Sequence, residues 1–428
     1  MFGRIKFSLI KNRVKSKNFI KDKKCQKNGH FFEFFLQVCY HRDIVFNQST
    51  MKVAQKEFTM EEGWKDITTQ DIDPTLFQLV LAFGKDTLIT NPSVFAQLKA
   101  FYPNAQIVLW SDNGQILNTR VTTDSVWVSA IYFEKTTVEC QSDIVVRTES
   151  FEAGKTLAGR LSKEGLCHVL VVSEGLDING SALIAWIRDV IGKDVTLSGW
   201  LAADNMLFKK TFVGYNAAPI DERRVVLIWF YGENLKVGLG SIGGWDKFWP
   251  QRTVTKSDGS TVYEIDGQPA LDLYKTYLWE FAKDLPGSGL LFPLSVQTEQ
   301  GITLVRTLLS IDEEKKSITY AWDVTEWSIA WLMKANFDKI IEGAGQSVKS
   351  GIDSIRSADF AFLISCAGRK AILKQRVEEE VENARYALGD ETVIGWFYSY
   401  GEIGPLWDIH SCYLHNQTMT VTLFKEIL

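Results

Sequence analysis

Residues 360–424 follow an order of segments that points to an α/β fold: strand, glycine turn, helix, strand, second glycine turn, strand. The first segment, residues 360–365, is too continuously apolar for a solvent-facing edge and is typical of a buried strand. In the helix that follows, apolar side chains recur at three- and four-residue spacing from Leu373 to Leu388. Residues 392–398 form the next strand. This order predicts one complete α/β unit.

The same order of segments recurs closer to the amino terminus. Gly84 and Gly114 mark its two turns, as Gly368 and Gly401 mark those of the later stretch. The second turns and the final strands also correspond, residues 111–116 with 398–403 and residues 125–133 with 418–424. We interpret this as a diverged duplication, with a third, approximate unit between the two copies. The predicted fold class is α/β, with two related halves of mixed β-sheets covered by helices and an internal strand-turn-helix-strand-turn-strand repeat.

The chain divides by composition and turn signals into three parts. Residues 1–50 carry 11 Lys and Arg against 3 Asp and Glu, whereas the remainder carries 36 against 49. We expect this basic extension to be a disordered tail or a start assigned too far upstream, with the true start near Met51. Residues 75–268 are predicted to form an N-terminal domain and residues 269–425 a C-terminal domain, because turn residues give way to a helix pattern at this point.

Composition also narrows the partners. Residues after 50 carry more acidic than basic side chains, so we expect no basic surface that would bind nucleic acid. No apolar run approaches the roughly 18 residues that a membrane-spanning helix needs, so no membrane partner is expected. Six cysteines without a close pair, in a chain too large to need disulfides, favour reduced thiols and a cytoplasmic protein.

Two glycine-containing motifs resemble nucleotide-binding sequences, but neither has the residues that such a site requires. Residues 154–156 resemble the end of a phosphate loop, but Glu149 stands where the first glycine of that loop belongs. Gly238, Gly240 and Gly243 have the spacing of a dinucleotide fingerprint. Tryptophans and a proline follow where a helix would have to start, so the pattern favours a glycine-rich β-turn.

Histidines and cysteines suggest no metal site. His410, Cys412 and His415 are three potential ligands within six residues, but no second cluster accompanies them. We therefore predict no metal. His168 opens an apolar strand and is interpreted as a core or edge histidine, with a haem ligand as the alternative.

Arg369 and Glu402 are the polar residues that the pattern places best for binding. Arg369 follows the strand of residues 360–365, and Glu402 follows the neighbouring strand. In open α/β sheets such loops converge on one rim, where ligands bind. A guanidinium suits a carboxylate and a carboxylate suits an ammonium group, so the pair would fit a zwitterion such as an amino acid. The alternative is that the two residues form a structural salt bridge with each other.

Four neighbouring residues complete the predicted ligand-binding set. Lys370 lies beside Arg369 at the helix start, and His415 and Asn416 would supply directional hydrogen bonds. Cys366 ends the strand. It could pair with His415 as nucleophile and base in a hydrolase, although a buried structural cysteine is the commoner case.

The residues that carry this argument also resemble the FIST domain family, over about residues 75–425. The similarity extends from the N-terminal to the C-terminal part of the family pattern. Its motifs are Ser365-Cys366-Ala367-Gly368-Arg369-Lys370, Tyr400-Gly401-Glu402-Ile403-Gly404-Pro405, Leu414-His415-Asn416-Gln417-Thr418, Asp204 to Thr211, Gly243-Gly244-Trp245, Tyr263 to Ala270 and Pro293-Leu294.

The resemblance implies a sensory role. FIST proteins are regarded as intracellular sensory modules, proposed to bind small ligands such as amino acids and to feed signalling proteins. Some members resemble haem-binding nitric-oxide sensors that act with histidine kinases.

The chain departs from the family pattern at three places. The first turn, residues 110–115, lacks the usual Gly-Glu and has Gln115 in place of the acid. Trp327 and Trp200 stand where small residues are usual. We expect these indoles to shrink or reshape a pocket and to change the choice of ligand.

Together these observations predict a cytoplasmic, non-enzymatic sensor for a small molecule such as an amino acid, with no catalytic residues. Its signal would pass to a separate partner such as a histidine kinase. No cofactor is expected. The alternatives are a haem-binding nitric-oxide sensor of the same family and a hydrolase that uses Cys366 and His415. The sequence names neither the ligand, the partner nor the oligomeric state.

Overall fold

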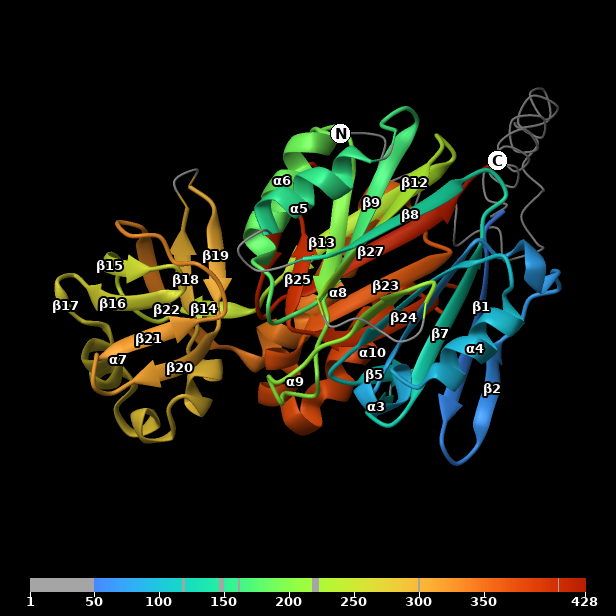
Figure 1. Ribbon diagram of the computed structural model, residues 1–428. Coiled ribbons are helices and arrows are strands. Elements are labelled where there is room, and N and C mark those ends of the chain that lie inside the picture. The colour runs from blue at the N-terminus through green and yellow to red at the C-terminus, as the bar shows by residue number, and fades with distance from the viewer. Residues whose placement is uncertain are drawn as a thin grey trace, which may run out of the picture. The chain divides into compact units, whose positions relative to one another are not determined.

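Three mixed sheets share one arrangement of strands, and a fourth, antiparallel sheet is inserted into the last of them (Figure 1). The computed structural model describes residues 50–428 except 118–119, 146–149, 161, 218–222, 299–300 and 407. The predictions for residues 1–49 therefore lie outside the described residues. The predicted α/β class, with mixed sheets, helical cover and an internal repeat, is confirmed.

The strands of the three sheets, within the described residues, lie side by side in the following spatial orders. The first sheet comprises β11 (Val213–Tyr215), β4 (Gln106–Ser111), β3 (Leu79–Gly84), β7 (Val126–Tyr132), β1 (Lys52–Thr59) and β2 (Gly63–Thr68). The second comprises β26 (Tyr413–His415), β25 (Gly401–Gly404), β10 (Thr196–Leu201), β9 (Leu166–Ser173), β12 (Arg224–Tyr231) and β8 (Thr137–Ile144). The third comprises β13 (Leu235–Ile242), β27 (Met419–Glu426), β23 (Phe360–Cys366), β24 (Val393–Ser399), β5 (Gln115–Leu117) and β6 (Arg120–Thr122).

The three sheets repeat one arrangement of strands and helices. In each, a parallel pair (β3–β4, β9–β10 or β23–β24) is joined by helix and flanked by an antiparallel strand, β7, β12 or β27. The helices in described positions are α3 (Asp86–Ile89), α4 (Pro92–Phe101), α5 (Ser150–Gly159), α6 (Gly180–Ile191), α7 (Ala270–Leu278), α8 (Phe337–Ile355), α9 (Ala367–Leu373) and α10 (Val377–Leu388). The predicted repeat thus occurs three times, and the approximate middle unit is one of its copies.

Every repeat lends a short arm to another repeat. The β5–β6 arm that follows β4 pairs with β24, β11 follows β10 but pairs with β4, and β25 follows β24 but pairs with β10. This exchange closes a cycle, so the three repeats are interlocked. It also means that strands from both sides of residue 269 share the second and third sheets. In the second sheet β25 and β26 follow that residue, and in the third β13 and the β5–β6 arm precede it.

The second turns of the three repeats are tied to one another by backbone hydrogen bonds. Each donor lies two residues after the acceptor of its own turn, and the bonds form a closed ring: Asn113 N–H to Tyr398 C=O (2.9 Å), Tyr400 N–H to Leu201 C=O (3.2 Å) and Ala203 N–H to Ser111 C=O (3.0 Å). The carboxyl ends of the parallel strands therefore meet, as the sequence predicted. By this register Gly114 corresponds to Gly401, as expected. Gly84 pairs with Ser111, and Ser365 pairs with Tyr398. Because Ser111 and Tyr398 are equivalent, Gly84 corresponds to Ser365 and not to Gly368.

Large aromatic side chains from all three sheets fill the space between them. Trp110 lies 5.1 Å from Phe83 and 4.6 Å from Trp200 between ring centroids, and Phe362 and Phe397 complete the cluster. Trp200 is fully buried there. The expectation that it reshapes a ligand pocket is therefore wrong: it fills the core where its own sheet meets the others.

The fourth sheet belongs to an insert, residues 245–335, that interrupts the third repeat between β13 and α8. Over the described residues its strands are β19 (Thr303–Arg306), β18 (Leu294–Gln297), β22 (Ile329–Ala335), β15 (Arg252–Asp258), β16 (Thr261–Ile265), β21 (Ser317–Tyr320) and β20 (Leu308–Asp312), with β14 (Trp245–Lys247) beside β22 and β17 (Gln268–Pro269) beside β16. The insert packs around its own apolar cluster, which includes Leu271 and Tyr274 of α7. Trp327 belongs to it and is 70% exposed.

The glycines that spell a dinucleotide fingerprint lie mostly in a strand. Gly238 and Gly240 belong to β13, so the predicted glycine-rich turn is wrong for them. Helix α8 crosses this strand so closely that a side chain at Gly240 would overlap the Ser347 carbonyl group. The glycines are needed for helix-on-strand contact, since only a residue without Cβ permits that approach.

Candidate functional site

Arg369 lies in α9 and is fully buried. Its Nη2 atom is 2.7 Å from Oε1 of Glu380, itself fully buried, and its Nε also donates to that oxygen at 2.8 Å. The guanidinium further donates to the carbonyl oxygens of Gly243 (2.9 Å) and Ile340 (2.6 Å). The predicted contact between Arg369 and a ligand carboxylate is therefore not what the structure shows, because Glu380 already supplies the anion and Arg369 lines neither of the two cavities described below.

Glu402 lies in β25 and is likewise fully buried. Oε1 accepts from the Ser399 hydroxyl at 2.8 Å, and Oε2 accepts from the hydroxyl and N–H of Thr418 at 3.1 and 3.3 Å. Burial raises the pKa of Glu402 to about 8. A carboxyl held in this way clamps the turn onto the start of β27, so the predicted contact with a ligand ammonium group is also wrong.

The first repeat shows the same clamp with a different residue. Gln115 is the counterpart of Glu402, and it bonds to Asp112 in its turn and to Ser125 at the start of the next strand (3.1 Å). Gln115, which replaces the acid that is usual at this position, thus keeps the structural function of the side chain. Neither Arg369 nor Glu402 pairs with the other in the structure, so the alternative of a mutual salt bridge is also wrong.

Glu402 gives the protein a pH-dependent stability. Its folded pKa lies above the unfolded value, so its contribution is present at low pH and is lost as pH rises from 4.5 through 8. We expect Glu402→Gln to be tolerated, as Gln115 is, and to be more stable than the parent at pH 9, where the parent must bury a charge. Urea unfolding at pH 5, 7 and 9 measures this. The exposed Glu382→Gln should retain the parent profile, and an equal slope in both variants would contradict the assignment.

His415 and Lys370 also face inward. Nε2 of His415, a residue only 2% exposed, lies 2.9 Å from the Gly404 carbonyl oxygen, and burial lowers its pKa to about 4. Lys370 donates to the Asn113 carbonyl group of the first repeat and lies over the Tyr398 ring. These two predicted ligand-binding residues therefore join segments of the protein and line none of the cavities found among the described residues.

Cys366 and Asn416 are the predicted residues that reach a cavity. We call it the rim cavity, because it lies where the strand ends of the third repeat meet the insert. It encloses about 220 Å³. Its walls are Met206, Phe208, Pro286, Gly287, Leu290, Thr307, Leu308, Leu309, Ala321, Cys366, Ala367, Gly368, Tyr400 and Asn416.

Two polar atoms on the walls of the rim cavity lack partners. Oδ1 of Asn416 and Oγ1 of Thr307 are buried and make no hydrogen bond within the described structure. Asn416 is 1% exposed and Thr307 is 7% exposed. Buried polar atoms are almost always satisfied, so two unsatisfied oxygens on residues that line one cavity call for an explanation. Apart from these groups the walls are mainly apolar.

The sequence did not identify all the walls of the rim cavity. Phe208 stacks on Tyr400 with ring centroids 4.6 Å apart, and the Tyr400 hydroxyl donates to Asp204. The segment from Asp204 to Phe208 carried a family motif, which was a usable signal. Thr307 and Leu308 carried none, because the insert reaches the cavity only through the tertiary fold.

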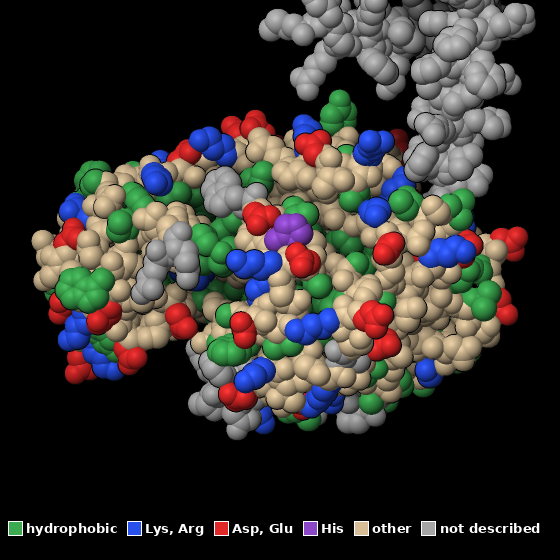
Figure 2. All heavy atoms as spheres, turned by 90° about the horizontal axis from the view of Figure 1, so that it is seen from above, with side chains coloured by type: hydrophobic (Ala, Val, Ile, Leu, Met, Phe, Trp, Pro, Cys, Tyr) green, Lys and Arg blue, Asp and Glu red, His purple; other side chains and the backbone are tan. Residues whose placement is uncertain are grey.

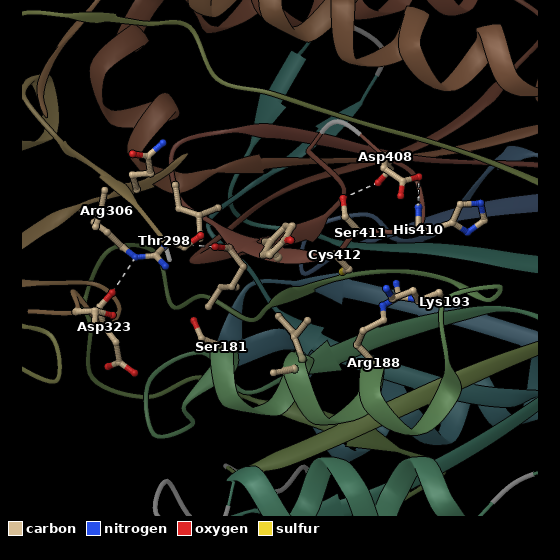
Figure 3. A pocket seen from close by; sticks show the side chains of 18 residues that line it. Ser181, Arg188, Lys193, Thr298, Arg306, Asp323, Asp408, His410, Ser411 and Cys412 are labelled. Carbon is tan, nitrogen blue, oxygen red and sulfur yellow. Dashed lines mark hydrogen bonds between the residues drawn. The ribbon is translucent and has the colours of Figure 1, made fainter. Parts of the chain in front are cut away.

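A larger cavity of about 620 Å³ lies elsewhere between the insert and the second repeat (Figure 3). Charged side chains of both signs and a histidine are visible at the edge of a hollow in Figure 2. His410 and Cys412 line this cavity, whereas His415 does not. Among the described residues no group of three or more His, Cys, Asp or Glu side chains is placed to hold a metal ion.

His168 does not fit a haem ligand, because both of its ring nitrogens already have partners. His168 is fully buried, with Nδ1 2.8 Å from the Thr196 hydroxyl and Nε2 3.1 Å from the Ser198 hydroxyl. It is the predicted core histidine. The hydrolase pair is not assembled either. Burial raises the pKa of the Cys366 thiol, and the His415 ring bonds to a carbonyl group instead of to Cys366.

Comparison with known proteins identifies the family. The FIST N domain matches residues 78–268 and the FIST C domain matches residues 270–405. An uncharacterized protein of Methanocaldococcus jannaschii is 28% identical over 252 residues, which are 50% of this chain and 47% of that protein. The chain thus matches about half of the length of this relative.

Two solved structures of cyanuric acid hydrolase, one from A. caulinodans, give TM-scores of 0.35 and 0.31. They share 7% and 8% identity with this chain, cover 89% and 88% of it, and are covered over 100% and 99% of their own length. At these scores the likeness carries no argument about activity.

None of the helices in the described ranges has the length and apolar character that crossing a membrane requires.

FIST domains are associated with sensing in signal transduction. Both domains match in order and together span most of the chain. The chain belongs to the FIST domain family.

Proposed function

We propose that this protein is a small-ligand sensor that binds its ligand in the rim cavity and signals through a separate partner protein, such as a histidine kinase. The observation that carries the proposal is the pair of unpartnered buried oxygens, Asn416 Oδ1 and Thr307 Oγ1, on an otherwise mainly apolar cavity. Each unsatisfied group costs about 1–3 kcal/mol. A ligand that donates a hydrogen bond to Asn416 recovers part of that free energy on binding.

The walls define the chemical class of the ligand. No Lys, Arg, Asp or Glu is among the described residues that line the rim cavity. A zwitterionic amino acid would leave both of its charges unpaired there, so it is not the ligand that this cavity favours. The volume of about 220 Å³ suits a small molecule. We therefore propose a small neutral ligand with an apolar body and an N–H or O–H donor.

The contacts around α9 offer a route from the cavity to the rest of the molecule. Cys366 and Ala367 line the cavity at the start of this helix, and Arg369 follows within its first turn. Arg369 donates to Gly243, just before the insert begins, and to Ile340, just after it ends. A ligand that shifts α9 would therefore act on both connections of the insert and change the surface that a partner meets.

Thr307→Val tests the proposal because valine keeps the shape of threonine and removes the hydroxyl. We expect the free variant to be about 1 kcal/mol more stable than the parent, since an unsatisfied group is gone. A thermal-shift screen of small neutral amides, lactams and phenols would supply the ligands. We expect those that bind the parent to lose at least fivefold in affinity for the variant.

Thr319→Val is the matched control on the same insert. The Thr319 hydroxyl bonds to that of Thr261 at 3.1 Å, away from the rim cavity. This variant should lose a little stability and keep full ligand affinity. Full affinity in Thr307→Val, or a loss of stability there like that in the control, would mean that the hydroxyl serves the fold and not a ligand.

A further inference from the structure

The cavity of about 620 Å³ is walled by three parts of the chain that are distant in sequence. Helix α6 of the second repeat forms one side, strands β18 and β19 of the insert form another, and the segment of residues 408–414, which leads into β26, closes it (Figure 3). None of the six residues predicted to bind a ligand lines it. Its volume lies within the range of ordinary small-molecule sites.

Arg306 on the wall of this cavity is a buried cation that forms no ion pair within the described residues. The residue is 6% exposed, and burial lowers its pKa to about 10. Nε donates to the Asp323 carbonyl oxygen at 3.2 Å, and Nη1 donates to those of Val305 and Leu414 at 3.3 Å. No carboxylate in the described part of the chain forms an ion pair with it. The Asp323 side chain instead accepts from Asn179 at 3.1 Å. The Asp323 carboxylate only partly offsets the burial of the guanidinium, so a bound anion would stabilise it further.

A second cationic group faces the other end of the cavity. Nη1 of Arg188 donates to the carbonyl oxygens of Gly192 (3.0 Å) and Val195 (2.6 Å), which fixes the side chain at the end of α6. Its Nε and Nη2 atoms are buried and donate to no oxygen or nitrogen atom of the described residues, although the guanidinium interacts with the Cys412 thiol. Lys193 lies beside Arg188, across the cavity from Arg306 (Figure 3).

The described acids at the cavity form no ion pair with these cations, although the Asp323 carboxylate partly offsets the effect of burial on the pKa of Arg306. Asp323 and Asp408 are the described lining carboxylates, against three Lys and Arg. Asp408 accepts from the His410 N–H at 3.1 Å. Between the two cationic ends the lining is largely aliphatic, with Ile184, Ala185, Val296, Leu304 and Leu414.

We infer that this cavity binds a small organic dianion, with one anionic group at Arg306, the other at Arg188 and Lys193, and an apolar chain between them. The site is distinct from the rim cavity and does not depend on the proposed function. Carboxylate and phosphate groups share the chemistry that a guanidinium recognises, so both are probed.

The repeat provides a matched control for Arg188. Arg385 occupies the same place at the end of α10, and its Nη1 donates to Gly389 (3.3 Å) and Thr392 (2.8 Å) in the same pattern. It lines a different cavity, and none of its donors is a buried atom without a partner. Arg188→Gln and Arg385→Gln therefore remove the same structural latch, but only the first removes the proposed ligand contact.

Isothermal titration of the full-length protein with succinate, glutarate, adipate, propyl phosphate and adipamide tests the inference. We expect saturable binding of at least one dicarboxylate, weakened by added salt and absent for the neutral adipamide. Tighter binding of propyl phosphate would indicate that one of the two cationic ends takes a phosphate group. Arg188→Gln should weaken the binding at least tenfold and Arg385→Gln less than twofold.

Two results would overturn the inference: no saturable binding of any of these anions, or equal losses in Arg188→Gln and Arg385→Gln. Arg306→Gln should abolish binding, and its melting temperature without ligand reports separately on folding. Lys193→Gln, on an exposed side chain, should weaken binding severalfold without a change in melting temperature, and unchanged binding would also count against the site. Thr307→Val should leave dianion binding unaltered, which separates this test from that of the rim cavity.

Discussion

Glu380→Gln is expected to lower the free energy of unfolding by about 3–5 kcal/mol, because it leaves the Arg369 guanidinium charged in the interior without its anion. Both side chains are fully buried, and the Nη2–Oε1 distance is 2.7 Å. Glutamine preserves the volume, so the loss reports the charge and not a cavity. The shift of the urea midpoint at constant slope measures it.

The neighbouring residue supplies the control. Glu379 lies beside Glu380 on α10 and accepts from Arg376 through two hydrogen bonds of 2.8 Å, but this pair is largely exposed. Glu379→Gln should therefore leave the urea midpoint nearly unchanged. Equal losses in the two variants would show that the ion pair of Arg369 is not what holds α9 in place.

A substitution of Arg369 would report on the stability of the fold and not on ligand binding. Arg369→Ala would leave Glu380 unpaired and would free the carbonyl groups at both connections of the insert. Loss of ligand binding in that variant would follow from damage to the fold. Substitution of the unpartnered residue Thr307 separates binding from stability, which is why it carries the test of the sensor proposal.

Gly240→Ala is expected to destabilise the protein by about 3 kcal/mol or more. A Cβ at this position would overlap the carbonyl group of Ser347 in α8, and backbone atoms of a packed helix move less readily than a side-chain tip. Either α8 must lift from β13 or the strand must bend. Thermal and urea unfolding, with far-ultraviolet circular dichroism to check the folded state, measure the loss.

Gly159→Ala makes the same chemical change where space is open. Gly159 lies in α5, no atom lies within 4 Å of the place that an alanine methyl group would take, and alanine favours helix more than glycine does. This variant should be up to about 1 kcal/mol more stable than the parent. A small loss in Gly240→Ala, close to the effect at Gly159, would mean that α8 adjusts easily and that close packing does not explain the glycines of β13.

Local sequence patterns predicted a large part of the architecture. Continuous apolar runs, helical spacing and glycine turns are each contained within a few neighbouring residues, so strands and helices could be placed without a structure. The correspondence of residues 111–116 with 398–403 holds because both turns occupy equivalent positions in the hydrogen-bonded ring. The family motifs at these turns likewise identified the family correctly.

The sequence by itself determined the order of elements, the repeat and the family, whereas only the tertiary structure decided which polar groups are available to a ligand. Arg369 and Glu402 follow strand ends as predicted, yet partners brought in by the fold, Glu380 and Thr418, occupy them. Thr307 and Arg306 carried no signal, because the insert that contains them meets the repeats only in the folded chain. Burial and the choice of partner depend on contacts between distant segments, and no local spacing in a sequence specifies those contacts.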